Sequence, residues 1–405
     1  MTTTAYTEDP RVLAAIERLN AGWNDRAISD IVDGEDHQYV DLVMEGGGVL
    51  GIALVGYTYA LEHAGIRFLG VGGTSAGAIN ATMVAALDRP SKPKSGKLLD
   101  LLGALDMFTF VDGDGDARDF VESLVEGAGP VKLGFKAVQV IDNLRDDLGL
   151  NPGHVFRRWV KGVLAEAGID TVADLEARMR DLPADLQRRD GTPVSVEEAA
   201  PKLAIIAADI STETRVEFPD MADLYFADPK GVNPARMVRA SMSIPAFFEP
   251  LKVRNVPRDP GARARWADKA GYHGKLPREV CFVDGGIMSN FPIDVFHAPG
   301  VPAAPTLGVK LGTERAKPNR VKRPLQLLGA VFNSARHTLD YEFIRRNPDY
   351  RNLVAFIPTG DHNWLNFFMK RKDKVDLFRR GVETAVDFLL SFDWEAYKTQ
   401  RATMA

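Results

Sequence analysis

The sequence predicts an α/β fold with a mainly parallel central sheet and an inserted helical cap. Two observations lead to this prediction. Between residues 39 and 87, apolar runs of strand length alternate with longer helical runs, which is the βαβα pattern of a parallel sheet. From about residue 90 to 200 the chain keeps helical periodicity without a convincing strand, and strand-like runs then resume.

Local patterns place the individual elements in this frame. Residues 1–38 are predicted to form a helical extension, in which Pro10 marks a helix start and Gly22 its end, and the main domain covers 39–400. Strands are predicted at 39–45, 66–73, 202–210, 278–286, 306–312 and 352–358. Helices are predicted at 52–64, 75–87, 233–244 and 373–392, and in the cap at 96–108, 152–168 and 171–182.

Composition restricts the class of protein. A chain of 405 residues with 45% hydrophobic and 26% charged residues can bury a large core without disulfides or metals. The 50 basic and 55 acidic residues give a net charge of −5, too balanced for a general polyanion binder, so we expect no nucleic-acid partner. The single cysteine, Cys281, excludes intrachain disulfides, fits a reducing compartment and is expected to be a small buried hydrophobe.

Contact with a membrane is expected to be peripheral. Residues 1–19 lack the basic and apolar regions of a cleavable signal peptide, and no run approaches the roughly 18 apolar residues that span a bilayer. We therefore expect a cytoplasmic protein. At 362–374, Trp364 and Phe368 lie beside four cations, a pattern that suits a lipid surface and equally a core segment meeting a solvated helix start.

Glycines are concentrated between the first predicted strand and helix of the main domain. Gly46, Gly48 and Gly51 fit the spacing G-x-G-x-x-G of a dinucleotide-binding loop, whose amides bind pyrophosphate. That fold also needs a carboxylate near the end of its second strand, and here the strand runs into Thr74 and Ser75. The amides are therefore predicted to face a transient oxyanion rather than a bound nucleotide.

The second predicted strand leads into a G-x-S-x-G motif, formed by Gly73, Ser75 and Gly77. Between a strand and a helix, this motif predicts a nucleophile elbow, a sharp turn that lifts the serine hydroxyl out of the sheet edge. A serine nucleophile requires a base and an oxyanion site at the same edge. The glycine loop emerges there, so its amides can face the carbonyl that Ser75 attacks.

Two types of base can activate this serine. An α/β-hydrolase supplies a histidine after an acid, and His297, His337 and His362 allow that order. Only one predicted strand precedes the elbow strand, however, where an α/β-hydrolase normally has several. Asp284 ends a predicted strand before two glycines and is the better candidate. A free aspartate, with a pKa of about 3.9, is a weak base, so its site must be partly desolvated and hydrogen-bonded to Ser75.

Four sequence blocks, in this order along the chain, resemble those of the patatin-like phospholipases. The resemblance is to a patatin domain of the bacterial type. The blocks are GGGVLG at 46–51, GTSAG at 73–77, ASMSIP at 240–245, and DGG at 284–286 followed by SNFP at 289–292. The resemblance spans roughly residues 40–310 and the final helix. It implies a three-layer α/β/α fold and a lipid acyl hydrolase that releases fatty acid from phospholipid or lysophospholipid through an acyl-enzyme.

The resemblance also implies the roles of individual residues. Ser75 is the nucleophile and Asp284 the base of a Ser-Asp dyad. The oxyanion hole consists of Gly46, Gly47 and Gly48, and loss of one such donor typically costs about 3–4 kcal/mol of barrier lowering. Supporting glycines are Gly51, Gly73, Gly77, Gly285 and Gly286. The acidic stretch 112–123 departs from an EF-hand loop and is interpreted as part of the cap, so no metal or cofactor is predicted.

One position departs from the family pattern. Many members carry a basic residue two positions after the third glycine, where this chain has Leu50. A basic insertion at about 251–278 is a candidate substitute, in which Arg263 and Arg265 are candidates to contact a lipid phosphate near the entrance of the site. The alternative is that these residues form a solvated insertion.

Two other functions are compatible with the same residues. A broad esterase or acyltransferase would use the same dyad and pass the acyl group to another alcohol. A gated lipid-binding effector would remain inactive until an activating protein or a small ligand moves the cap. The expected partner of the hydrolase is a lipid substrate at a membrane or micelle surface.

Overall fold

The computed structural model describes residues 3–24, 26–113, 148–312, 321, 334–335 and 342–404. The strands of these residues are β1 (Ile31–Val32), β2 (Gln38–Met44), β3 (Ile66–Thr74), β4 (Gly149–Asn151), β5 (Gln187–Arg188), β6 (Leu203–Asp209), β7 (Thr214–Phe218), β8 (Ala246–Phe248), β9 (Leu251–Arg254), β10 (Glu279–Asp284), β11 (Thr306–Leu311) and β12 (Val354–Ile357).

Helices surround these strands. The α-helices are α1 (Thr4–Thr7), α2 (Pro10–Gly22), α3 (Ile52–His63), α4 (Ala76–Ala86), α5 (Ser95–Gly103), α8 (His154–Glu166), α9 (Val172–Arg180), α10 (Val196–Ala199), α11 (Ala235–Ser241), α12 (Ala262–Ala270), α14 (Arg371–Ser391) and α15 (Trp394–Met404). The 3-10 turns are η1 (Gly48–Gly51), η2 (Met107–Phe110), η3 (Ala222–Leu224), η4 (Gly285–Ile287), η5 (Ile293–Phe296) and η6 (Pro348–Asn352). The helix predicted between Pro10 and Gly22 is confirmed as α2.

The central sheet is mixed, which corrects the prediction of a mainly parallel sheet. The described strands form one ten-stranded sheet, with the path β12-β11-β2-β3-β6-β10-β9, and a separate pair of β4 with β8. Neighbours from β12 to β6 run parallel, whereas β10, β9, β7, β1 and β5 join antiparallel. One cause is local: β7 follows β6 after the short connection 210–213, and a tight turn joins only antiparallel strands.

Strands β3 and β10 lie end to end along the same edge of β6. The other edge is taken by β7, which pairs with Ile205–Asp209. Along the first edge, β3 pairs in parallel with Leu203–Ile206, and β10 pairs antiparallel with Ala207–Asp209. The carboxyl ends of β3 and β10 therefore meet head to head, where Thr74 is the partner of Ile206 and Asp284 the partner of Ala207.

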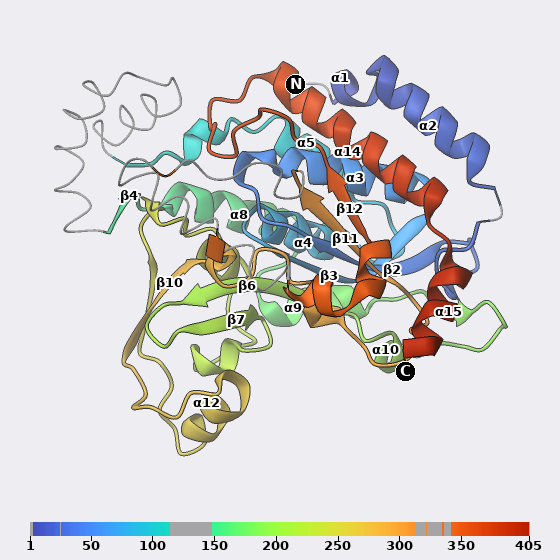
Figure 1. The fold of residues 1–405 in the computed structure, drawn as a ribbon. Coiled ribbons are helices and arrows are strands. Elements are labelled where there is room, and N and C mark those ends of the chain that lie inside the picture. The colour runs from blue at the N-terminus through green and yellow to red at the C-terminus, as the bar shows by residue number, and fades with distance from the viewer. Residues whose placement is uncertain are drawn as a thin grey trace.

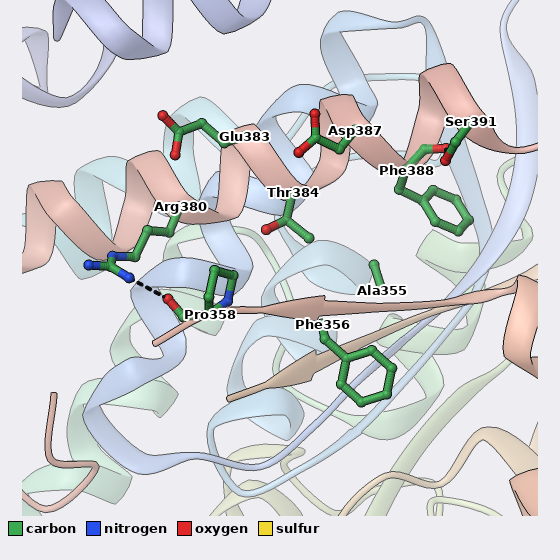
Figure 2. A pocket seen from close by; sticks show the side chains of 9 residues that line it. All are labelled: Ala355, Phe356, Pro358, Arg380, Glu383, Thr384, Asp387, Phe388 and Ser391. Carbon is green, nitrogen blue, oxygen red and sulfur yellow. Dashed lines mark hydrogen bonds between the residues drawn. The ribbon is translucent and has the colours of Figure 1, made fainter. Parts of the chain in front are cut away.

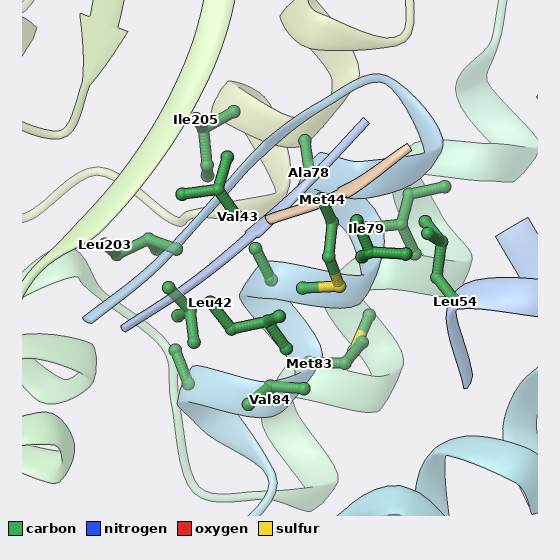
Figure 3. Close-up of a cluster of buried hydrophobic side chains, with 14 of the residues drawn as sticks. Leu42, Val43, Met44, Leu54, Ala78, Ile79, Met83, Val84, Leu203 and Ile205 are labelled. Atoms are coloured by element: carbon green, nitrogen blue, oxygen red, sulfur yellow. The ribbon is translucent and has the colours of Figure 1, made fainter. Parts of the chain in front are cut away.

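Helices α3 and α4 pack on the parallel part of the sheet, and α14 lies across α3 (Figure 1). Apolar side chains of β2, β6, α3 and α4 fill the space between them (Figure 3). On β3, a Cβ added to Gly70 or Gly72 would lie within 2.7 Å of the Phe296 ring, so η5 packs directly on the strand backbone. Every residue of β6 is buried, as expected for a strand covered on both faces.

The described residues form helices where the cap was predicted, together with short strands that were not predicted. α8 and α9 fall within the predicted helical runs and α5 begins at Ser95, just before its run, whereas β4 and β5 were missed because they are very short. Residues 114–147 lie outside the described residues, so the cap as a whole stays a prediction. Asp112, at the start of the predicted acidic loop, accepts hydrogen bonds from Gly153 N and Val155 N at the beginning of α8. Cys281 is only partly buried, because it points away from the side of β10 that buries Val280 and Phe282.

The close contact of α3 with α14 depends on two glycines. A Cβ on Gly381 would lie 2.0 Å from Ala53 O, and one on Gly56 would lie 2.0 Å from Phe378 O. We expect Gly381→Ala to lower the free energy of unfolding by about 1–3 kcal/mol, because the helix backbones must move apart. Urea unfolding followed by circular dichroism measures this change.

Gly162→Ala is the matched control, since Gly162 also lies inside a helix, α8, and an added Cβ would meet nothing within 4 Å. It should leave stability unchanged or raise it by up to about 1 kcal/mol through higher helix propensity. Equal stability of the two variants would contradict the packing role of Gly381.

Candidate active site

Ser75 occupies a strained turn between β3 and α4. Its φ of +53° and ψ of −120° lie in a region that residues with a side chain rarely adopt. The flanking glycines permit the turn: a Cβ on Gly73 would lie 2.4 Å from the carbonyl carbon of Gly77, and one on Gly77 would lie 2.1 Å from Met44 O. Ser75 therefore occupies the sharp strand-to-helix turn that the motif predicts.

The structure brings Ser75 and Asp284 into direct contact. Ser75 Oγ donates a hydrogen bond to Asp284 Oδ2 at 2.7 Å, and each residue is only 3% exposed. Asp284 Oδ1 accepts a second hydrogen bond, from Gly286 N at 2.7 Å. Gly285 lies so close to β6 that an added Cβ would be 2.1 Å from Ile206 O. A carboxylate held on both oxygens next to a serine hydroxyl is placed to take the hydroxyl proton.

The block at 240–245 supports both members of this pair. Ser241 Oγ accepts a hydrogen bond from Ser75 N at 2.9 Å, and Met242 Sδ lies 3.2 Å from Ser75 Oγ. Ser243 O accepts a hydrogen bond from Asp284 N at 2.8 Å. The sequence pattern identified this block but not its structural role. Its two serines were the feature that could have indicated hydrogen bonds to the dyad.

Arg239, on α11, ties this block to neighbouring segments and was missed by sequence reasoning. Its guanidinium donates to Ser243 Oγ at 2.5 Å, to Pro152 O at 2.9 Å and to Glu249 O at 2.8 Å. Burial lowers the pKa of Arg239 to about 10, which leaves it charged at neutral pH. A buried cation therefore links the segment before α8, the residue after β8, and Ser243, whose carbonyl holds the Asp284 amide.

The glycine loop lies beside Ser75, but its three amides are not equivalent. Gly46 N donates to Asn290 O at 3.0 Å, so this amide is occupied, contrary to its predicted place in the oxyanion hole. Among the residues that the structure describes, the amides of Gly47 and Gly48 have no acceptor. A Cβ on Gly46 would lie 3.1 Å from Ser75 Cβ, which shows how close the loop is to the serine. Gly47 and Gly48 remain the candidate oxyanion donors.

The positions predicted to supply a cation do not contact this site. Leu50 is 6% exposed and packs in the main apolar core. Arg265 pairs with Asp259 at 2.6 Å and with Asp223 at 3.6 Å, both outside the dyad and the glycine loop. Its helix α12, which also carries Arg263, lies at the bottom of Figure 1, apart from α3 and the loop that precedes it. The head-group role of these arginines stays a prediction without a supporting contact.

The histidines considered as bases have other partners. His297 Nδ1 lies 2.9 Å from the Tyr350 hydroxyl, and His362 Nε2 lies 3.1 Å from Asp376 Oδ2. His337 lies outside the described residues. Of His297, His362 and Asp284, it is Asp284 that forms a hydrogen bond with Ser75.

A groove of about 430 Å³ lies between β12 and α14, and Figure 2 labels the residues that line it. Arg380 crosses one end and donates to Pro358 O at 2.7 Å. None of the lining residues belongs to the dyad or the glycine loop.

In the part of the chain that the structure describes, no helix combines the length and apolarity needed to cross a membrane, and no three His, Cys, Asp or Glu side chains are grouped to hold a metal ion.

Comparison with known proteins assigns the family. The sequence matches the family model described as patatin-like phospholipase over residues 42–297, a range that includes Ser75, the glycine loop and Asp284. The match covers more than half of the chain. The chain therefore belongs to the patatin-like phospholipase family, and its class is that of a lipid hydrolase.

Individual similar proteins share 30% or less of their sequence with this chain. The chain is 30% identical over 353 residues to the uncharacterised protein YqhO of Bacillus subtilis strain 168, covering 87% of this chain and 98% of that one. VipD from Legionella pneumophila is 17% identical with a TM-score of 0.41, covering 90% of this chain and 70% of that one. Human GIVD cytosolic phospholipase A2 is 10% identical with a TM-score of 0.43, covering 96% and 64%. The family assignment rests on the sequence match alone.

Substitution of Gly48 by alanine tests how tightly the glycine loop is packed. The φ of Gly48 is +54°, and an added Cβ would lie 2.3 Å from Trp364 O, which also accepts a hydrogen bond from Val49 N. We expect Gly48→Ala to lower the free energy of unfolding by about 2–5 kcal/mol, because the left-handed backbone and the clash both cost free energy. Thermal unfolding monitored by tryptophan fluorescence measures the change.

The control is Gly191→Ala, because Gly191 has a φ of +86° but an added Cβ would meet nothing within 4 Å. This variant should lose only the backbone contribution, about 1–2 kcal/mol. If both variants lose the same stability, the contact of Trp364 with the loop is not a constraint.

Proposed function

We propose that this protein releases fatty acid from phospholipid or lysophospholipid through a Ser75–Asp284 dyad. The observation that carries the proposal is the 2.7 Å hydrogen bond from the serine hydroxyl to the carboxylate, at a strained strand-to-helix turn. Membership of the patatin-like phospholipase family supports a lipid ester as the substrate. Contact with the lipid surface would be peripheral.

In the proposed reaction, Asp284 takes the hydroxyl proton as Ser75 Oγ attacks the acyl carbonyl carbon. The negative charge that develops on the carbonyl oxygen is stabilised by the amides of Gly47 and Gly48. Asp284 then gives the proton to the departing alcohol oxygen, which leaves the acyl group on Ser75. In the second half, Asp284 accepts a proton from water as the water oxygen attacks the acyl-enzyme, and the proton returns to Ser75 Oγ as the fatty acid leaves.

Hydrogen bonds hold the Asp284 carboxylate in position for the proposed proton transfer. Both of its oxygens accept hydrogen bonds, and its backbone amide is fixed by Ser243 O. The carboxylate is thus aligned before substrate arrives, which reduces the reorganisation that the transition state requires. Burial of the pair removes competing water, which strengthens the contact between them.

A gated effector is the second candidate function, favoured by the closure of the site. Ser75 is 3% exposed, and the segment that carries Trp364 packs on the glycine loop beside it. Phe367 of this segment stacks on Phe247 with ring centres 4.3 Å apart. A lipid ester reaches Ser75 only after covering residues move, and an activating protein or small ligand would supply that movement.

An esterase or acyltransferase shares the same acyl-enzyme and differs only in the acceptor.

Hydrolysis of mixed phospholipid and lysophospholipid vesicles tests the proposal. Wild type should release free fatty acid, detected by mass spectrometry, and Ser75→Ala should release none above background. Asp284→Asn should be slower by about 10²- to 10⁴-fold, the usual contribution of a general base. Transfer to added glycerol or methanol would identify the acyltransferase alternative.

The control variant is Ser391→Ala, because Ser391 is an exposed serine at the end of α14. It should hydrolyse the vesicles at the wild-type rate. Fatty acid release that persists in folded Ser75→Ala would overturn the assignment of the nucleophile, and an inactive wild type would favour the gated function.

A further inference from the structure

Glu45, the residue immediately before the glycine loop, has a buried side chain held by β11. Its side chain is 2% exposed, and its Oε1 lies 2.6 Å from Lys310 Nζ. Its Oε2 accepts a hydrogen bond from Leu311 N at 2.6 Å, and its own N–H donates to Val309 O at 3.0 Å. Three consecutive residues of one strand therefore hold Glu45.

The same strand also contacts the loop itself. A Cβ on Gly47 would lie 2.4 Å from Leu311 Cδ1, so the end of β11 packs directly on a candidate oxyanion donor. Lys310 is itself well fixed: its side chain is 14% exposed, and Nζ lies 4.5 Å from the centre of the Phe291 ring. Lys310 Nζ is therefore held against Glu45, the residue that leads into the glycine loop.

The charge of Glu45 makes this contact necessary for an oxyanion site. A buried carboxylate next to the loop would repel the negative charge that develops in the transition state, and a low-dielectric surrounding strengthens the repulsion. The loop has no cation of its own, since residues 46–54 contain no Lys or Arg and Leu50 is buried in the core. Lys310 supplies the compensating positive charge.

We propose that Lys310 is a positioning residue that neutralises Glu45, so that the glycine loop can receive an oxyanion; this inference rests on the proposed function. Glu45 anchors the loop to β11 through both of its oxygens, and Lys310 cancels the field that this anchor would otherwise impose. Lys310 acts through Glu45 and touches neither Ser75 nor the substrate.

A charge-paired set of variants tests the inference, with a soluble short-chain ester as substrate. Lys310→Met leaves the carboxylate uncompensated and should lower kcat by about 10- to 100-fold with little change in KM, because the loss is confined to the transition state. Glu45→Gln/Lys310→Met removes both charges and should restore kcat to within about threefold of Glu45→Gln. Lys310→Arg should keep most of the activity because it keeps the charge.

Lys202→Met is the matched control. Lys202 forms a 2.7 Å ion pair with Glu217 and lies 5.9 Å from the centre of the Phe296 ring, so it has the same two kinds of contact away from the loop. Its kcat should equal that of wild type. Thermal unfolding of every variant separates lost charge compensation from lost folding.

The possible outcomes separate the two proposals. Recovery of kcat in the double variant supports charge compensation by Lys310. A folded double variant that is as slow as Lys310→Met, measured beside an active wild type, overturns the inference and leaves the proposed function standing. A wild type without Ser75-dependent hydrolysis overturns the proposed function and, with it, the role of Lys310.

Discussion

The backbone of β6 is the constraint on which the site depends. Two strands that arrive from opposite directions share one of its edges, and their carboxyl ends meet at Ile206 and Ala207. Ser75 follows one strand end and Asp284 closes the other, so the pairing of backbones brings hydroxyl and carboxylate together. The absence of side chains at Gly73, Gly77 and Gly285 is required because each lies against another backbone at this junction.

The strain of the turn and the burial of charge are balanced by hydrogen bonds from nearby segments. A positive φ at a serine costs about 1–3 kcal/mol and persists only where the surroundings hold it. Here Ser241 holds the Ser75 amide, Ser243 holds the Asp284 amide, and Arg239 holds Ser243. Strand β11 holds the glycine loop through Glu45. The site is thus fixed from several directions before any substrate binds.

Local sequence patterns were sufficient where the structure is determined locally. The G-x-S-x-G motif predicted the turn at Ser75 because the glycines and the strand-to-helix change are adjacent in the chain. The antiparallel pairing of β10 was not predictable in this way, since it depends on which part of the β6 edge is still unoccupied. The occupied amide of Gly46 and the link from Arg239 to Ser243 likewise depend on contacts between distant segments. The cation near the glycine loop could not be predicted from the sequence around Leu50 either. It is Lys310, which lies on β11, far away in sequence.

Covalent labelling can distinguish whether Ser75 is the nucleophile and Asp284 its base. The protein would be treated with a fluorophosphonate, and the adduct located by intact-mass measurement and peptide mapping. We expect one adduct on Ser75, absent in Ser75→Ala and formed at least about 100-fold more slowly in folded Asp284→Asn. An adduct on another serine, or an Asp284→Asn variant labelled at the wild-type rate, would contradict these roles.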